Sequence, residues 1–277
     1  MPYVTTPELR LYYEQSGAGP QPVLLVHGSF ASSRWWQPVL ALLPDEQFTC
    51  YAPDLPGCGR SDRPDDPASY TIDRLAAAVA ELIDGLDLWN VDLVGHSLGA
   101  AVALSYAVAA PGRLRSLTLV STPSPQGTPT PPEGYALLEQ MRGDRGLLMQ
   151  ALASIMPAQA PDPFFQQLVD DAQGQAPAAF SAAALALQQW RLDPDDLRQL
   201  RLPVLLVWGD RDQIVERSVQ TGLLLAIPGA NNLEVLRGCG HTPMVERPEV
   251  FALVLLNFIG QDFAGYEAIR QTAEGDQ

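Results

Sequence analysis

Apolar and polar positions along the chain follow two alternating patterns, short apolar runs and longer stretches with helical spacing. Runs such as Val23–Val26 and Val204–Val207 are apolar on both sides, as expected of buried parallel strands. From Ile72 to Leu86 the apolar residues recur every three or four positions, which predicts an amphipathic helix with Thr71 as its N-cap. Strands that alternate with helices in this way predict an α/β fold, with a mostly parallel sheet flanked by helices.

The same patterns assign most of the remaining chain. Loose alternation from Tyr3 to Gln15 predicts two short antiparallel strands at a sheet edge. Further strands are predicted at 22–26, 48–52, 91–94, 114–120, 204–208 and 233–236. Further helices are predicted at 35–43, from Ala100 onward, at 215–226 and at 248–258. We therefore expect an eight-stranded sheet, followed by a polar tail after Ile259.

One segment departs from this alternation. Residues 122–200 contain ten prolines, no histidine and no cysteine, and nothing in them resembles a sheet strand. Helices are predicted there at 136–141, 147–155, 164–171 and 178–190. We interpret 122–200 as a helical cap over the carboxyl edge of the sheet, with the proline-rich stretch 122–132 as its entry hinge. The core domain is then formed by 1–121 and 201–277.

Composition narrows the classes of partner and cofactor. A formal net charge of −15 disfavours binding to nucleic acid and to anionic membrane surfaces. No apolar run is long enough to cross a bilayer, and the N-terminus lacks the features of a secretory signal, so a cytoplasmic protein is expected. Three distant cysteines and three histidines argue against disulfides and against a zinc or iron site. We expect no cofactor and no metal, and a monomer or small homo-oligomer.

The candidate chemistry centres on Ser97. It lies in the pattern Gly95-x-Ser97-x-Gly99, after an apolar strand and before a helix rich in small residues. Glycines two positions before and after the serine allow the strand and the helix to approach closely, which is typical of a nucleophile elbow. The N–H of Leu98, at the start of the helix, can then stabilise an oxyanion that develops on a substrate.

A serine nucleophile needs a general base and an orienting carboxylate. His27 follows its own strand and His96 adjoins Ser97, so neither is well placed to bond the serine. His241, in a glycine-containing loop before the last helix, is the predicted base. Of the two acids after the strand 204–208, we assign the orienting role to Asp212 and a turn-stabilising role to Asp210. The order Ser, Asp, His fits a strand, elbow and helix architecture.

With these residues identified, the sequence resembles the α/β-hydrolase fold superfamily, in its capped branch of serine esterases, lipases and carbon–carbon hydrolases. The resemblance extends from Tyr3 to Ile259 and rests on five short segments: His27-Gly28-Ser29, 54–62, Gly95–Gly99, Gly209–Asp212 and Gly240-His241. It implies a cap inserted between the sixth and seventh strands. It also implies an oxyanion hole formed by the N–H groups of Ser29 and Leu98, with Phe30 as a further contributor. Serine as the nucleophile departs from the haloalkane dehalogenase and epoxide hydrolase branches.

The leading functional prediction is a serine hydrolase that cleaves a small-molecule carboxylic ester through an acyl-enzyme. A carbon–carbon bond hydrolase, a lactonase or a cofactor-free perhydrolase would use the same three residues, and a ligand-sensing protein could share the fold. The cap is expected to determine the substrate. Candidate pocket walls are the large apolar residues near the predicted edge and in the cap: Phe30, Trp35, Met156, Phe165, Trp190 and Met244.

Overall fold

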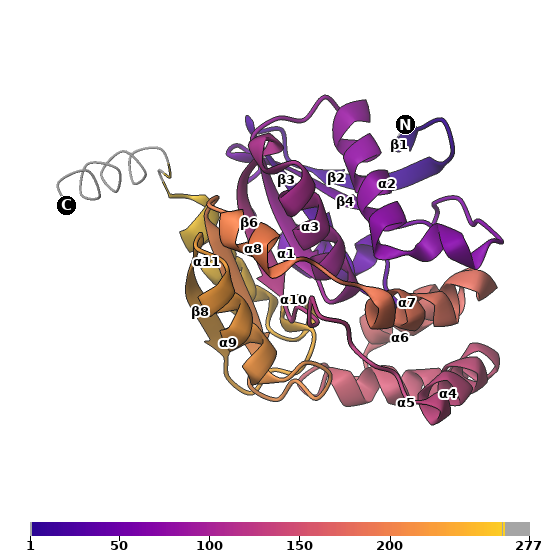
Figure 1. Ribbon diagram of the computed structural model, residues 1–277. Helices are drawn as coiled ribbons and strands as arrows, with labels where there is room; N and C mark the ends of the chain where they lie inside the picture. The colour runs from indigo at the N-terminus through magenta and orange to yellow at the C-terminus, as the bar shows by residue number, and fades with distance from the viewer. Residues whose placement is uncertain (1, 262, 264–277) are drawn as a thin grey trace.

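The computed structural model describes residues 2–261 and 263 and contains one eight-stranded sheet, in the order β1-β2-β4-β3-β5-β6-β7-β8 (Figure 1). The strands are β1 (Tyr3–Thr5), β2 (Arg10–Ser16), β3 (Gln21–Val26), β4 (Phe48–Pro53), β5 (Val91–His96), β6 (Leu114–Val120), β7 (Val204–Gly209) and β8 (Ala230–Leu236). The β1–β2 and β2–β4 pairs are antiparallel and all other pairs are parallel. This arrangement confirms the predicted fold class.

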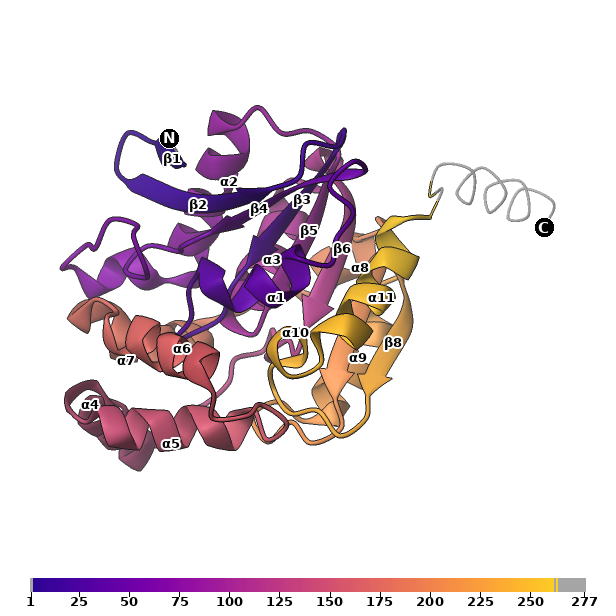
Figure 2. The ribbon, with the colours of Figure 1, turned by 180° about the vertical axis from the view of Figure 1, so that it is seen from behind.

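Helices cover both faces of the sheet. One face carries α2 (Ile72–Gly85), α3 (Leu98–Ala109), α8 (Pro194–Gln199) and α9 (Arg217–Ala226). The opposite face carries α1 (Gln37–Leu40), α10 (Pro243–Glu246) and α11 (Pro248–Ile259). Figures 1 and 2 show these two layers from opposite sides. The strands β5 and β7 are buried along their whole length, which agrees with the apolar run Val204–Trp208 in β7, whereas β5 also buries the polar residues Asp92 and His96.

Two helix predictions need correction. The single helix expected at 35–43 is a 3₁₀ turn over Ser33–Trp36 followed by the short α1. Pro38 lies at the start of α1 and lacks an N–H group, so the first turn cannot continue as one regular helix. The six-residue helix α8 was not predicted, because it is too short to show a helical period.

The segment between β6 and β7, residues 121–203, is called the insertion below. It contains α4 (Pro132–Gly143), α5 (Arg145–Ile155), α6 (Pro163–Gln173) and α7 (Pro177–Gln189), which confirms the four predicted helices. These helices lie together beyond one end of the sheet in both views (Figures 1 and 2). α8 also belongs to this segment, but it packs against α9 on the sheet.

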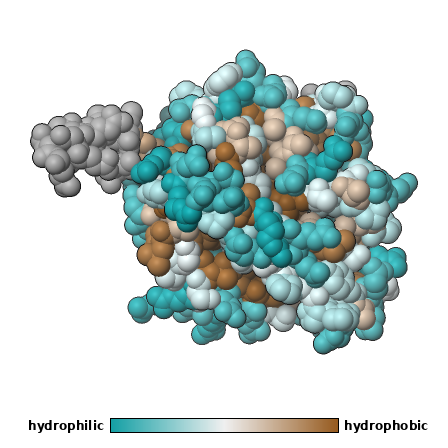
Figure 3. Space-filling model, in the orientation of Figure 1, coloured by the Kyte–Doolittle hydropathy of each residue, from teal (hydrophilic) through white to brown (hydrophobic). Residues whose placement is uncertain are grey.

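The surface in the orientation of Figure 1 is mainly hydrophilic, with hydrophobic areas over α9 and between α9 and the insertion (Figure 3). Within the described residues, no helix combines the length and the apolar character that a membrane span requires.

Candidate active site

The turn between β5 and α3 places Ser97 at the carboxyl end of a central strand. Ser97 has φ 52° and ψ −118°, a backbone conformation that residues other than glycine rarely adopt. The neighbouring glycines are required by close approach, because a Cβ on Gly95 would lie 2.4 Å from the carbonyl oxygen of Gly99. A Cβ on Gly99 would lie 2.4 Å from the carbonyl oxygens of Val26 and His27. The observed backbone is therefore that of a strand–turn–helix elbow, as the sequence pattern predicts.

Ser97 opens into a cavity of about 340 Å³ between the sheet and the insertion. The lining side chains come from the sheet edge, from the loop before α4, and from α4, α5 and α7: Ser29, Phe30, Trp35, His96, Ser97, Thr128, Thr130, Leu138, Met141, Ala151, Leu152, Ser154, Ile155, Ala183, Ala184, Leu187, Ile214 and His241. This lining contains no arginine, aspartate or glutamate. A volume in this range fits a small ligand with an apolar body.

His241 and Asp212 form a buried hydrogen-bonded pair, with 2.9 Å between Nδ1 of His241 and Oδ2 of Asp212. The side chain of Asp212 is 0% exposed and that of His241 is 5% exposed. Oδ1 of Asp212 accepts the N–H groups of Ile214 at 2.8 Å and Val215 at 3.0 Å. Both carboxylate oxygens are therefore fixed, one by the histidine and one by the backbone.

Burial alone would raise the pKa of Asp212, but the hydrogen bond and charge of His241 and the two backbone N–H groups outweigh it and lower this pKa. An ionised Asp212 accepts a hydrogen bond from Nδ1–H of His241, which leaves Nε2 as the acceptor nitrogen whenever the ring is neutral. Asp210 does not bond His241. Its Oδ1 accepts the N–H of Gly238 at 2.6 Å, which links the loops that follow β7 and β8.

The other two histidines make structural hydrogen bonds. Nδ1 of His27 bonds the carbonyl of Gly28 at 2.8 Å, and its Nε2 accepts the N–H of Leu55 at 2.9 Å. Nε2 of His96 donates to the carbonyl oxygen of His241 at 2.9 Å. Burial, reinforced by the charge of His241, lowers the pKa of His96 to about 3, so this ring is neutral near pH 7.

Two of the residues predicted to supply oxyanion donors line the same cavity, and the third, Leu98, adjoins Ser97 in the chain. Ser29 and Phe30 line it, and Phe30 turns the loop after β3 with a φ of 57°. Leu98 is the first residue of α3, where backbone N–H groups have no partner within the helix. The loop after β3 lies next to Ser97, since a Cβ on Gly28 would be 3.1 Å from Cβ of Ser97, and Leu98 follows Ser97 directly. That these N–H groups form an oxyanion hole stays a prediction.

Of the six candidate pocket residues, the structure places Phe30 and Trp35 in the cavity lining. The other four, Met156, Phe165, Trp190 and Met244, lie in the hydrophobic core and outside this lining. Trp190, for example, turns toward α3, where its indole N–H donates to the hydroxyl of Ser105 at 2.9 Å. The structure thus places these four side chains in the hydrophobic core and not in the wall of this cavity, contrary to the prediction.

Several lining residues were not singled out from the sequence, notably Leu138, Met141, Ile155, Leu187 and Ile214. Their apolar character was visible in the predicted helices and in the loop after Asp212. The pattern could not say which apolar side chain of a helix would face Ser97, because that depends on how the insertion helices pack on the sheet.

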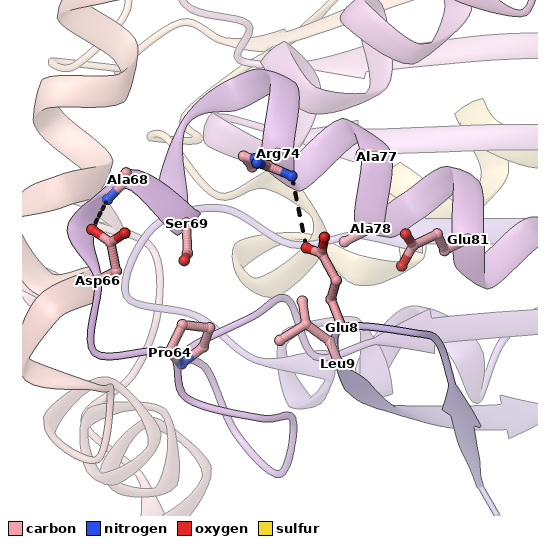
Figure 4. Close-up of a pocket in the computed structure, with 10 residues that line it drawn as sticks. All are labelled: Glu8, Leu9, Pro64, Asp66, Ala68, Ser69, Arg74, Ala77, Ala78 and Glu81. Carbon is pink, nitrogen blue, oxygen red and sulfur yellow. Dashed lines mark hydrogen bonds and ion pairs between the residues drawn. The ribbon is translucent and has the colours of Figure 1, made fainter.

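A second hollow lies apart from this site, between the β1–β2 turn, the loop 64–69 and α2 (Figure 4). Arg74 and Glu8 face each other across it at 3.7 Å, and Asp66 caps the short 3₁₀ turn by accepting the N–H of Ala68. None of the candidate residues lines it. Within the described residues, no three His, Cys, Asp or Glu side chains gather as a metal-binding group would require.

Known proteins share both the sequence pattern and this architecture. Residues 23–253 match the model of the alpha/beta hydrolase family. The 2-hydroxymuconate semialdehyde hydrolase of Pseudomonas sp. strain CF600 is 30% identical over 273 residues, covering 91% of each chain. A 2-hydroxy-6-oxononadienedioate/2-hydroxy-6-oxononatrienedioate hydrolase of Pseudomonas putida is 28% identical and covers 91% of this chain and 92% of that relative.

Among solved structures, an esterase from Exiguobacterium antarcticum superposes with a TM-score of 0.84 at 25% sequence identity. The superposition covers 94% of this chain and 99% of the esterase. The family match spans most of the chain, including the elbow at Ser97 and the loop of His241. The chain therefore belongs to the alpha/beta hydrolase family.

Proposed function

We propose that this protein is a serine hydrolase that cleaves carboxylic esters with Ser97 as nucleophile, His241 as general base and Asp212 as the orienting acid. The observation that carries the proposal is the buried pair of Asp212 and His241, 2.9 Å apart, beside the cavity into which the strained Ser97 opens. Such a constellation can activate a serine without a metal or an organic cofactor.

In the proposed reaction, Oγ of Ser97 attacks the ester carbonyl carbon while Nε2 of His241 accepts the hydroxyl proton. The backbone N–H groups of Ser29 and Leu98 stabilise the oxyanion, and Asp212 stabilises the imidazolium. His241 then returns the proton to the leaving alcohol, which departs and leaves an acyl-enzyme on Ser97. Water, activated by His241, cleaves this ester and releases the acid.

We further propose that the insertion acts as a cap that selects the acyl group. Its helices α4, α5 and α7 contribute apolar side chains, including Leu138, Leu152 and Leu187, to the cavity lining. A lining without arginine offers a substrate carboxylate hydroxyl groups but no guanidinium as an ion-pair partner, so burying the carboxylate there is costly. The preferred substrates are therefore neutral esters with a short or medium apolar acyl chain.

The second candidate function is hydrolysis of 2-hydroxy-6-oxo acids. It is suggested by the names of the two Pseudomonas relatives. The same serine and histidine could serve it. Its support is the sequence similarity, and the neutral cavity lining weighs against it, because the dienedioate named for one relative carries two carboxylates.

A matched pair of esters tests the proposed preference for a neutral acyl group, and a dienedioate substrate tests the second candidate. We expect p-nitrophenyl butyrate to be hydrolysed with a kcat/KM at least about 10-fold above that of mono-p-nitrophenyl succinate, which has the same chain length and one carboxylate. Ser97→Ala should abolish both activities while circular dichroism shows an intact fold. A preference for the succinate ester, or turnover of a dienedioate above that of any ester, would reject the neutral-ester proposal.

A further inference from the structure

Glu246, the last residue of α10, is a buried carboxylate outside the proposed triad, with 7% of its surface exposed. Both of its oxygens accept hydrogen bonds. Oε1 accepts the N–H of Thr242 at 3.1 Å and its hydroxyl at 3.1 Å, and the N–H of Gly240 lies 3.0 Å from each oxygen. Oε2 also accepts the N–H of Ala158 at 3.0 Å. Every one of these partners is a donor, so the site suits an acceptor-only carboxylate.

The donors come from two segments that are far apart in sequence. Gly240 and Thr242 flank His241, whereas Ala158 lies between α5 and α6 of the insertion, 88 positions from Glu246. Glu246 therefore joins the loop of the proposed catalytic histidine to the insertion through one side chain.

Further contacts tie the same two segments together. The N–H of His241 donates to the carbonyl oxygen of Ile155, the last residue of α5, at 2.8 Å. Gly240 packs directly against the insertion, because a Cβ there would lie 2.4 Å from Cδ of Pro157 and 2.5 Å from the Ile155 oxygen. Three consecutive residues, 240–242, are thus held by hydrogen bonds to Glu246 or to the insertion.

We propose that Glu246 is a positioning residue that keeps the loop 240–242 seated on the α5–α6 connection, so that His241 is aligned with Ser97 only while the insertion is in place. This inference rests on the proposed function for its catalytic part. Asp212 fixes the imidazole ring from one side, and the backbone that carries the ring is fixed by Glu246 and Ile155. A shift of the α5–α6 connection would therefore move the base.

The catalytic part is tested with Glu246→Gln, which keeps the size of the side chain but places an NH₂ donor against N–H donors. We expect kcat on p-nitrophenyl acetate and on p-nitrophenyl butyrate to fall about 10- to 100-fold, with KM within about twofold, because a misplacement near 1 Å costs about that much. Glu249→Gln, an exposed change in the first turn of α11, is the matched control and should leave both constants unchanged. A folded Glu246→Gln protein with kcat within twofold of wild type would overturn the proposal.

The coupling to the insertion is tested without any substrate, by hydrogen exchange measured on peptides that cover 153–160 and 237–246. In Glu246→Gln, both peptides should exchange at least about 10-fold faster, and neither should change in Glu249→Gln. Unchanged exchange at 153–160 would reject the coupling even if kcat fell. Because this readout does not involve turnover, it stands if Ser97→Ala shows that the proposed function is wrong.

If Glu246→Gln does not fold, Thr242→Val provides a milder variant. Thr242 is fully buried, and valine has nearly the same size. The change removes only the hydroxyl that donates to Oε1 of Glu246. We expect kcat to fall about threefold and the same two peptides to exchange faster, with KM unchanged, as the loss of a single hydrogen bond would produce. Wild-type kcat and wild-type exchange in this variant would overturn the proposal.

Discussion

The substitution Asp212→Asn tests the proposed triad through the tautomer of His241. In the wild-type site, Oδ1 of Asp212 accepts two backbone N–H groups and Oδ2 accepts Nδ1–H of His241. An asparagine must place its carbonyl oxygen toward the N–H groups of Ile214 and Val215, because its NH₂ group cannot accept them. The NH₂ group then faces Nδ1 of His241, which becomes an acceptor, and the ring proton moves to Nε2.

In this tautomer His241 cannot accept the proton of Ser97. The equivalent change in serine proteases lowers kcat about 10⁴-fold, and we expect a loss of similar size here, equal to about 5 kcal/mol of transition-state stabilisation. The fold should survive, because the asparagine keeps the two backbone hydrogen bonds and fills the same volume.

The assay is steady-state hydrolysis of p-nitrophenyl butyrate by the wild type, Asp212→Asn and the control Asp210→Asn, with thermal unfolding of each protein. Asp210 accepts one N–H group, that of Gly238, and an asparagine carbonyl can replace that acceptor. Asp210→Asn should therefore keep kcat within about threefold of wild type. If Asp212→Asn were folded and within 10-fold of wild type, Asp212 would not be the acid that orients His241.

Two further predictions concern the cavity and the buried histidine. Leu187→Ala should raise KM for p-nitrophenyl butyrate about fivefold, with little change in kcat on the acetate ester. The control Phe165→Ala, in the core, should lower the free energy of unfolding by about 3–5 kcal/mol and leave the chain-length preference unchanged. An unchanged chain-length preference in Leu187→Ala would show that Leu187 does not contact the substrate. The pKa of His96 is about 3 in the folded state, below its ordinary value of 6.5, so its contribution to stability is complete above pH 6.5 and is lost as the pH falls toward 3. At pH 4.5 urea unfolding should show a loss of about 2–3 kcal/mol from this residue, and a folded His96→Asn protein with the same pH dependence as wild type would contradict that account.

The sequence was most informative where a residue's role follows from its place at the end of a strand. The elbow at Ser97 could be predicted because close approach of strand and helix demands glycine at positions 95 and 99, and the structure has both contacts. Asp212 and His241 each follow a strand of a parallel sheet, so topology alone brings their loops to one edge. The roles of these residues remain proposals, while the fold that brings them together is confirmed.

The sequence was least informative where a role depends on packing between distant segments. Trp190 and Leu187 occupy the same predicted helical stretch, yet Trp190 turns to Ser105 on α3 and Leu187 lines the cavity. Hydrophobicity could not separate them, since both side chains are apolar. Glu246 was not singled out from the sequence. One of its partners, Ala158, lies far away in the insertion, and the residues around Glu246 predict only a short helix.

The most direct test of the account is covalent labelling with a fluorophosphonate, followed by mass spectrometry of the intact protein and its peptides. A serine activated by His241 should react once per chain, so the wild type should gain one phosphonyl group on the peptide that contains Ser97. Ser97→Ala should gain none and should lose nearly all turnover of p-nitrophenyl butyrate while remaining folded. An adduct on another residue, or a folded Ser97→Ala protein with turnover near that of wild type, would contradict the assignment of Ser97 as the nucleophile.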